Sequence, residues 1–147
     1  MNSVGHLEET LIMTQEDKQL LLKDLSARLP YGVKMRYKDD SGYEVLCQID
    51  TFYKDVDGFR CLLRTTGPYG AFQDLNELKP YLRPMSSMTE EEGEEYRTEC
   101  KKVLIMRYRT NSHYPVTDWL NEHHFDYRGL IEKGLALEAP EGMYKFE

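Results

Sequence analysis

Cysteines are few in this sequence, and long apolar runs are absent. The three cysteines, Cys47, Cys61 and Cys100, are odd in number and lack the spacing of metal ligands, as is typical of reduced thiols in a cytosolic protein. No apolar run approaches the roughly 20 residues that a membrane-spanning helix needs. The N-terminus has no basic region followed by an apolar one. These absences predict a soluble, cytoplasmic chain with neither a signal peptide nor a membrane partner.

The sequence also lacks a phosphate-binding loop and paired metal-ligand motifs. Neither His-x3-His nor Cys-x2-Cys spacing occurs. His123 and His124 lie near His113, Asp118 and Asp126 in the sequence, but adjacent residues of a helix point about 100° apart and do not easily ligate one ion. We therefore expect histidines at a helix end, bonded to the backbone, with no metal and no cofactor.

No nucleophile in the sequence has an evident base beside it. Ser86 and Ser87 stand at a predicted helix start, where capping explains them, and Cys100 follows an acidic stretch that disfavours a thiolate. Three carboxylates recur at intervals of four residues, namely Asp118, Glu122 and Asp126. On an unbroken helix they share one face, which we interpret as a solvated surface and not as an acid–base pair. The sequence thus predicts a protein that is not an enzyme.

Charge and composition narrow the classes of function that remain. An apolar fraction of 40% with 12% aromatic residues suffices for a packed core, and the formal net charge of −7 disfavours a nucleic-acid partner. The acidity is local, because six glutamates against one arginine between Thr89 and Glu99 give −5 and leave −2 for the rest. A basic face elsewhere on the protein therefore remains open.

The first half of the chain alternates helix and strand patterns. Residues 1–13 read as a loose tail, Thr14 as a helix N-cap and Pro30 as the stop of that helix. Its apolar stripe consists of Leu21, Leu22, Leu25 and Leu29. Period-2 alternation then predicts a hairpin of strands at Val33–Lys38 and Tyr43–Thr51. The expected register pairs Tyr37 with Tyr43, Met35 with Val45 and Val33 with Cys47.

Further strands complete a small antiparallel sheet of four to five strands. The run Phe59–Thr65 predicts a third strand in which Cys61 lies opposite Thr51 and Cys47 opposite Thr65. Three segments follow it: a short strand at Ala71–Gln73, a helical turn at Leu75–Leu78 and an edge strand at Lys79–Arg83. In strand count and length this sheet resembles an SH3-like or Tudor-like barrel, a likeness that carries no function by itself.

The second half is predicted to be helical. Thr89 and Glu92 have the spacing of a capping box, whereas the apolar run 103–108 fits a strand or a continued helix equally well. Short helices are expected at Val116–His124 and at Asp126–Lys133, with Gly134 as the stop. The fold class is therefore α+β, with a tail (1–13), a helix plus barrel-like domain (14–85) and a helical C-terminal unit packed on it (86–147), or one compact domain overall.

Two segments carry a resemblance to a known family. The phrases KPYLRPMSSMT (79–89) and DWLNEHHFDYRGLIEKGLALEAP (118–140) resemble short uncharacterised proteins from prophage and mobile-element regions of gut bacteria. The resemblance covers most of the chain from Met13. It implies a cytoplasmic accessory protein of phage or mobile-element origin, and it supplies no catalytic residue.

Protein interaction is the function that we expect, with an unidentified protein partner and an oligomeric state that the sequence leaves open. Tyrosines near turns suit peptide contacts, and the acidic segment 90–99 suits either a basic partner or plain solvation. The alternative is a small nucleic-acid-binding module, since a basic sheet face with exposed Phe52 and Leu62 could hold a single strand. The basic residues of this sheet face also have a plainer explanation, because the uncovered face of a sheet needs polar residues in any case. The candidate interaction surface comprises Lys34, Arg36, Lys38, Arg60, Arg64, Tyr81, Arg83, His123, His124, Tyr127 and Arg128.

Overall fold

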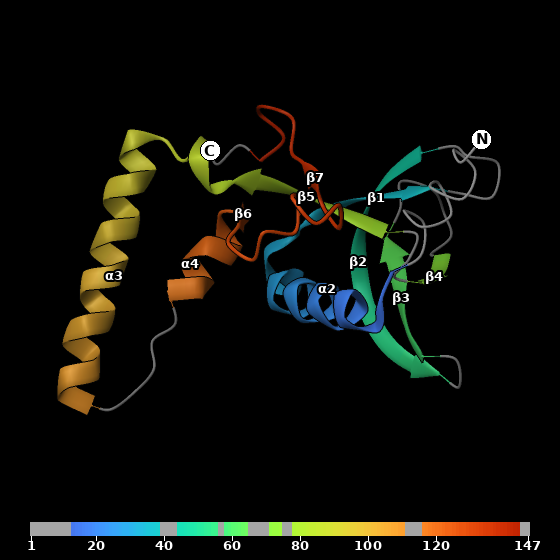
Figure 1. Cartoon of the computed structure of the whole chain (residues 1–147), viewed down its shortest axis with the longest axis horizontal. Helices are drawn as coiled ribbons and strands as arrows, with labels where there is room; N and C mark the ends of the chain where they lie inside the picture. The colour runs from blue at the N-terminus through green and yellow to red at the C-terminus, as the bar shows by residue number, and fades with distance from the viewer. Residues whose placement is uncertain are drawn as a thin grey trace.

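The computed structural model describes residues 13–38, 44–55, 58–64, 71–74, 78–110 and 116–144 (Figure 1). Within these ranges, the side chains of Lys38, Val45, 50–64, 71–74 and 106–110 fall outside the description. The elements in chain order are α2 (Gln15–Arg28), η1 (Leu29–Tyr31), β1 (Lys34–Lys38), β2 (Glu44–Asp55), β3 (Gly58–Arg64), β4 (Ala71–Asp74), β5 (Leu78–Pro84), η3 (Met85–Ser87), α3 (Glu90–Thr110), α4 (Val116–Glu122), β6 (Phe125–Asp126) and β7 (Leu137–Glu138). The predicted tail, 1–13, lies outside the described residues except for Met13.

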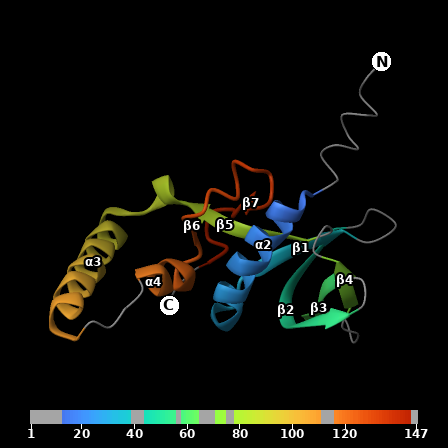
Figure 2. The same ribbon diagram turned by 60° about the horizontal axis from the view of Figure 1, so that its bottom comes forward.

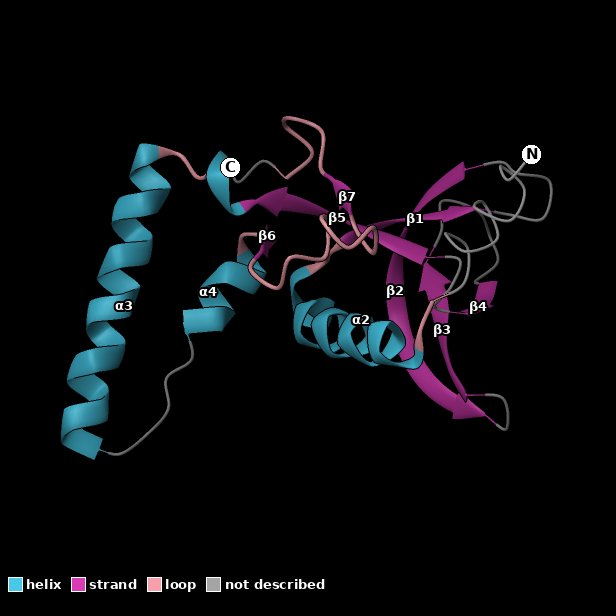
Figure 3. Cartoon of the chain, viewed as in Figure 1, coloured by secondary structure: helices cyan, strands magenta, loops and turns pink. Residues whose placement is uncertain are grey.

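The predicted α+β class is confirmed. One mixed sheet has the strand order β4-β3-β2-β1-β5-β6, with β7 also paired to β5 (Figure 3). The pairs from β4 to β5 are antiparallel, whereas β6 and β7 run parallel to β5. The likeness to an SH3-like barrel stays a prediction.

Helix α2 forms as its cap and leucine spacing predict. The Oγ1 atom of Thr14 accepts a hydrogen bond of 3.0 Å from the amide of Asp17. Pro30 falls in η1, and Gly32, with φ of 68°, turns the chain into β1. The predicted stripe needs a correction, because the buried residues of α2 are Leu21, Asp24, Leu25 and Arg28. Leu22 and Leu29 of the predicted stripe do pack against the core but are only partly buried, whereas the charged pair Asp24 and Arg28 is fully buried.

The first hairpin exists, but its predicted register is wrong by two residues. Met35 pairs with Cys47 and Tyr37 with Val45, so the loop begins after Lys38 and ends before Glu44. A shift of two preserves which face each side chain occupies. Met35 and Cys47 are accordingly both buried, as the alternation predicted. Tyr43, the expected partner of Tyr37, lies outside the described residues.

Strand β3 pairs with β2 across a β-bulge that the sequence did not reveal. Ile49 lies opposite Leu63, which is the predicted register, but the pairing shifts by one beyond Ile49. Cys61 therefore lies opposite Phe52, and its predicted pairing with Thr51 is wrong. A bulge adds one residue to one strand and re-aims everything after it, so a register extrapolated through it fails.

Strand β5 is a central strand, which corrects the prediction of an edge strand at Lys79–Arg83. It pairs with β1 on one side and with β6 and β7 on the other. Pro80 lies opposite Met35 inside the sheet and is almost fully buried. Pro80 suggested an edge because proline cannot donate to a ladder. The helical turn predicted over Leu75–Leu78 lies outside the described residues except for Leu78, which begins β5.

The C-terminal third is only partly helical. Helix α3 runs unbroken through 103–108 for a total of 21 residues, so the C-terminal helices are not all short. Helix α4 forms as predicted but ends at Glu122. The second helix predicted at Asp126–Lys133 is wrong, because Asp126 lies in β6 and turns follow it. Asp126 still binds the backbone that follows it, since its carboxylate accepts hydrogen bonds from the amides of Leu130 (2.9 Å) and Ile131 (3.0 Å) in the turns after β6.

The core lies between α2, one face of the sheet and the C-terminal segment (Figures 1 and 2). Its buried apolar residues are Leu21, Leu25, Val33, Met35, Cys47, Ile49, Leu78, Leu82, Leu130, Leu135 and Ala136. The last three come from the C-terminal segment, which is therefore part of the same core as the sheet. Helix α3 contributes none of them and stands at one margin of the molecule, with α4 between it and the rest.

Candidate functional site

Helix α3 is anchored at its N-terminal end by the predicted capping box. The Oγ1 atom of Thr89 accepts from the Glu92 amide, and Oε1 of Glu92 accepts from the Thr89 amide, both at 3.1 Å. Arg83 of β5 also donates two hydrogen bonds to the Glu92 carboxylate, at 2.7 and 2.8 Å. The bonds from Arg83 lower the pKa of Glu92 to about 2 against a smaller opposing effect of burial. This bidentate pair ties the first turn of α3 to the sheet.

An aromatic stack around Trp119 forms a second anchor. The Trp119 ring lies 4.0 Å from the His123 ring, 5.6 Å from Tyr96 of α3 and 5.9 Å from Phe125 of β6, measured between centroids. The guanidinium of Arg83 lies 4.2 Å from the Phe125 centroid. The stack therefore joins α3, α4 and β6 to the arginine that holds the cap.

Beyond these anchors, α3 exposes two adjacent large apolar side chains. Leu104 and Ile105 expose 65% and 55% of their surface. Between α3 and α4 runs an open groove of about 580 Å³. Its lining residues are Glu91, Glu94, Glu95, Thr98, Glu99, Lys102 and Trp119. We define the outer face of α3 as its exposed residues from Glu90 to Ile105, and this face is the candidate interaction surface that the structure offers.

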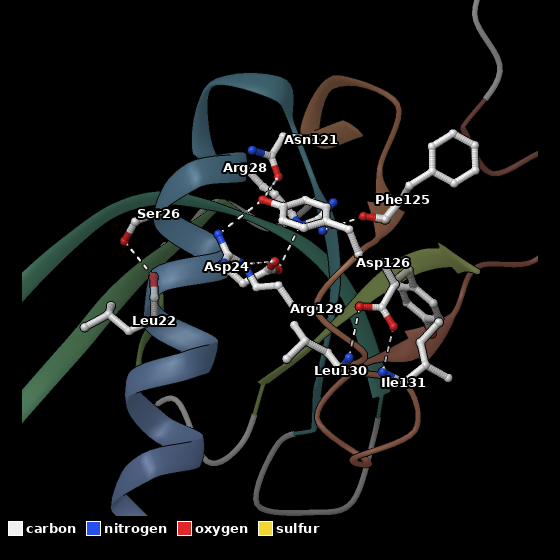
Figure 4. Close-up of polar contacts among 12 residues, drawn as sticks. Leu22, Asp24, Ser26, Arg28, Asn121, Phe125, Asp126, Arg128, Leu130 and Ile131 are labelled. Carbon is white, nitrogen blue, oxygen red and sulfur yellow. Dashed lines mark hydrogen bonds and ion pairs between the residues drawn. The ribbon is translucent and has the colours of Figure 1, made fainter. Parts of the chain in front are cut away.

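Side chains from both halves of the chain meet in a buried polar network (Figure 4). Asp24 accepts from Nε of Arg28 at 2.7 Å and from Nε of Arg128 at 3.1 Å. Arg28 also donates to the Phe125 carbonyl at 2.6 Å. Both Arg28 and Arg128 lie over the Tyr127 ring, whose hydroxyl donates to Asn121. The network fixes the C-terminal segment to α2, so its role is structural.

The predicted basic sheet face is partly occupied by the chain itself. Nζ of Lys34 donates to the Met143 carbonyl at 3.1 Å, and its amide donates to the Tyr144 hydroxyl at 2.8 Å. Arg36 forms an ion pair of 3.3 Å with Glu44. The side chains of Lys38, Arg60 and Arg64 lie outside the description. Of the five predicted cations, the two that are described thus make contacts within the chain.

The six predicted residues of the C-terminal half do come together, around β5 and β6. Arg83, Tyr127 and Arg128 make the contacts given above, and the Tyr81 carbonyl accepts from the Tyr144 hydroxyl at 2.8 Å. His123 bonds to the Trp119 carbonyl at 2.9 Å, and the His124 ring stacks on Tyr144 at 3.7 Å. The sequence analysis assigned them to an interaction surface, and their described contacts join segments of this chain.

Among the described residues, Ser87 and the three spaced carboxylates occupy positions that differ from those that the sequence suggested. The Ser87 hydroxyl donates to the Pro84 carbonyl at 2.6 Å, and the capping role predicted for Ser86 and Ser87 belongs to Thr89 instead. The three carboxylates at intervals of four do not share a helical face, because α4 ends at Glu122 and Asp126 is buried in β6. A second open cavity, of about 840 Å³, is lined by residues of 83–92 and 138–144, and its only described arginine, Arg83, is bound to Glu92.

Comparisons with protein-family models, with curated proteins and with solved structures give no match. Within the described ranges, no cluster of three or more His, Cys, Asp or Glu side chains could hold a metal ion. His113 lies outside those ranges. No helix of the described part is both long and apolar enough to cross a bilayer.

His124 predicts an acid-dependent loss of stability. It is buried with φ of 64°, and burial, together with the nearby Arg28, Arg83, His123 and Lys34, lowers its pKa to about 4 from 6.5. The unfolded chain therefore binds this proton more tightly than the folded chain. Its contribution is fully present above about pH 6.5 and falls by roughly 3 kcal/mol as the pH decreases to 4.

The test uses His124→Asn, because asparagine tolerates a positive φ and does not titrate. Urea unfolding of both proteins is measured between pH 7.5 and 5, each relative to its own value at pH 7.5. The variant is expected to lose much less stability over this range. Glu92 does not confuse the result, since its lowered pKa costs stability only as the pH falls from about 4.5 to 2. Equal losses in the two proteins would contradict the prediction.

Proposed function

We propose that this chain is a non-enzymatic, cytoplasmic accessory protein of phage or mobile-element origin that acts by binding another protein through α3. The observation that carries the proposal is the exposed pair Leu104 and Ile105 on a helix that is anchored through its N-terminal half. Exposed apolar side chains on a helix rimmed by charges are typical of a protein-binding surface. The resemblance of 79–89 and 118–140 to prophage and mobile-element proteins supports the proposed origin.

The anchors support this function because they hold α3 in a fixed position. Arg83, Glu92 and Trp119 fix the helix while using side chains that face the body of the protein. A pre-ordered helix loses little conformational entropy when it binds, which favours affinity. The outer face then meets a partner without refolding of the rest.

The test is a capture experiment with the tagged protein and host lysate, divided into nuclease-treated and untreated halves. Leu104→Ser/Ile105→Ser is expected to reduce recovery of the partner at least tenfold, since its apolar contacts are lost. Leu46→Ser is the matched control, because Leu46 is an exposed leucine (48%) on β2, away from α3. A partner lost equally from both variants would count against α3. Recovery that requires intact nucleic acid would favour the nucleic-acid alternative instead.

A further inference from the structure

The outer face of α3 carries opposite charges along its length. Four exposed glutamates lie in its first two turns, and two exposed lysines lie past its middle. These residues are Glu90, Glu91, Glu94, Glu95, Lys101 and Lys102. At 100° per residue, Glu94, Thr98, Lys101 and Ile105 fall on one side of the helix. The same surface is therefore acidic at one end and basic toward the other.

The helix dipole accounts for only part of this arrangement. Glutamates in the first turn of a helix are stabilised by the dipole, but the effect falls off within that turn. Glu94 and Glu95 lie in the second turn, and Lys101 and Lys102 are eight or more residues from the C-terminal end. A contact with a surface of complementary charge explains these inner charges.

We propose that the occupant of this face is α3 of a second copy of this chain, in antiparallel orientation about a twofold axis at Thr98. Glu94 and Glu95 precede Thr98 by three to four residues, and Lys101 and Lys102 follow it by the same number. At a rise of 1.5 Å per residue, both pairs lie about 5 Å from the axis. Each pair of carboxylates then meets the pair of ammonium groups of the other copy.

The orientation follows from the charges. A parallel arrangement would set glutamate against glutamate, and like charges are unfavourable. The antiparallel contact is isologous and closes as a dimer. Helix α3 stands at one margin of the molecule, with α4 between it and the rest of the protein, so its exposed side chains are within reach of a second copy (Figures 1 and 2).

Contacts within the chain leave these charges available. Nζ of Lys102 lies 3.1 Å from Glu99, and Glu95 lies 3.9 Å from His123, yet the Lys102 and Glu95 side chains remain 59% and 61% exposed. The Thr98 hydroxyl donates to the Glu94 carbonyl at 2.9 Å, which lays this small side chain against its own helix at the crossing point. Exposed ion pairs contribute roughly 0.2–1 kcal/mol each, and one helix pair buries little area. The expected dimer is weak and weakens with salt.

The experiment uses two charge-reversal variants of the full chain, Glu94→Lys/Glu95→Lys and Lys101→Glu/Lys102→Glu, in sedimentation equilibrium. The wild type is expected to dimerise reversibly at high micromolar concentration and low salt. Each variant by itself is expected to lower the affinity of dimerisation at least tenfold. An equimolar mixture of the two variants is expected to form a heterodimer about as tight as the wild-type dimer, because every facing pair again has opposite charge. Glu16→Lys/Glu132→Lys controls for net charge, since both residues are exposed, lie outside α3 and line neither of the two cavities described above.

This inference rests on the proposed function, because both use α3 as the contact surface. The experiments nevertheless distinguish failure of the self-pairing from failure of the proposed function. A wild type that stays monomeric, a dimer unaffected by either variant, or a mixture that does not associate would each overturn the self-pairing. Loss of a captured protein from Leu104→Ser/Ile105→Ser would still support the proposed function in those cases. Association restored in the mixture, with the control variant unchanged, supports the antiparallel dimer.

Discussion

Replacement of Asp24 by asparagine is expected to lower the free energy of unfolding by about 3–5 kcal/mol. Asp24 is fully buried, and its two carboxylate oxygens bind Arg28 at 2.7 Å and Arg128 at 3.1 Å. Asparagine keeps the shape but removes the charge, so Arg28 is left buried without a counter-ion. One nitrogen of Arg28, Nη1, already has no hydrogen-bond partner among the described residues. The loss is measured as a lower midpoint of urea unfolding at unchanged slope.

Glu44→Gln is the matched control, because Glu44 pairs with Arg36 at 3.3 Å but is largely exposed. Its expected cost is about 0–1 kcal/mol. The double variant Asp24→Asn/Arg28→Met is expected to lose less stability than the sum of the single changes, since the second change removes the orphaned charge. Similar costs for Asp24→Asn and Glu44→Gln would show that the buried network is not a structural anchor.

The buried pair Asp24–Arg28 shows what sequence reasoning missed in α2. An acid and a base four residues apart are typical of an exposed helix face, where such pairs contribute little. The signal that could have revealed the burial is positional. Asp24 and Arg28 stand three and seven residues after Leu21, on the side of the helix that Leu21 and Leu25 also occupy.

Local patterns predicted local structure well. The Thr14 cap, the capping box of Thr89 and Glu92, and the alternation of the first hairpin depend on neighbours within a few residues, and all three form. The parallel pairing of β5 with β6 and β7 depends on segments about 40 to 55 residues apart. Proline in β5 and the short apolar runs near Asp126 gave no sign of it. Long-range pairing therefore accounts for the errors in β5 and after α4.

For the candidate site, the sequence likewise indicated some of the residues but not the exposed element. Arg83, His123 and His124 were singled out and do lie close together, but they bind other parts of the chain. Helix α3 is the exposed element, and its apolar run at 103–108 fitted a strand equally well. Exposure of Leu104 and Ile105 follows from where α4 packs on α3, which no periodicity reports.

Phe125→Ala is expected to cost about 3–5 kcal/mol and to loosen both anchors of α3. The Phe125 side chain is fully buried, and its ring lies 5.9 Å from the Trp119 ring and 4.2 Å from the Arg83 guanidinium. Its removal leaves a cavity and frees the arginine that binds Glu92. Trp119 is the only tryptophan, so its fluorescence reports directly on this stack. Emission is expected to shift to longer wavelength as water reaches the indole.

Two further variants separate local loosening from general destabilisation. Phe125→Leu keeps most of the volume and is expected to remain folded, yet it loses the ring stack and should still alter Trp119 emission. Leu25→Ala removes a fully buried side chain of α2 at a cost of about 2–5 kcal/mol without touching Trp119. In the folded state its emission should match the wild type. If Leu25→Ala shifts the emission as much as Phe125→Leu does, Trp119 reports overall stability and Phe125 does not specifically hold α3 in place.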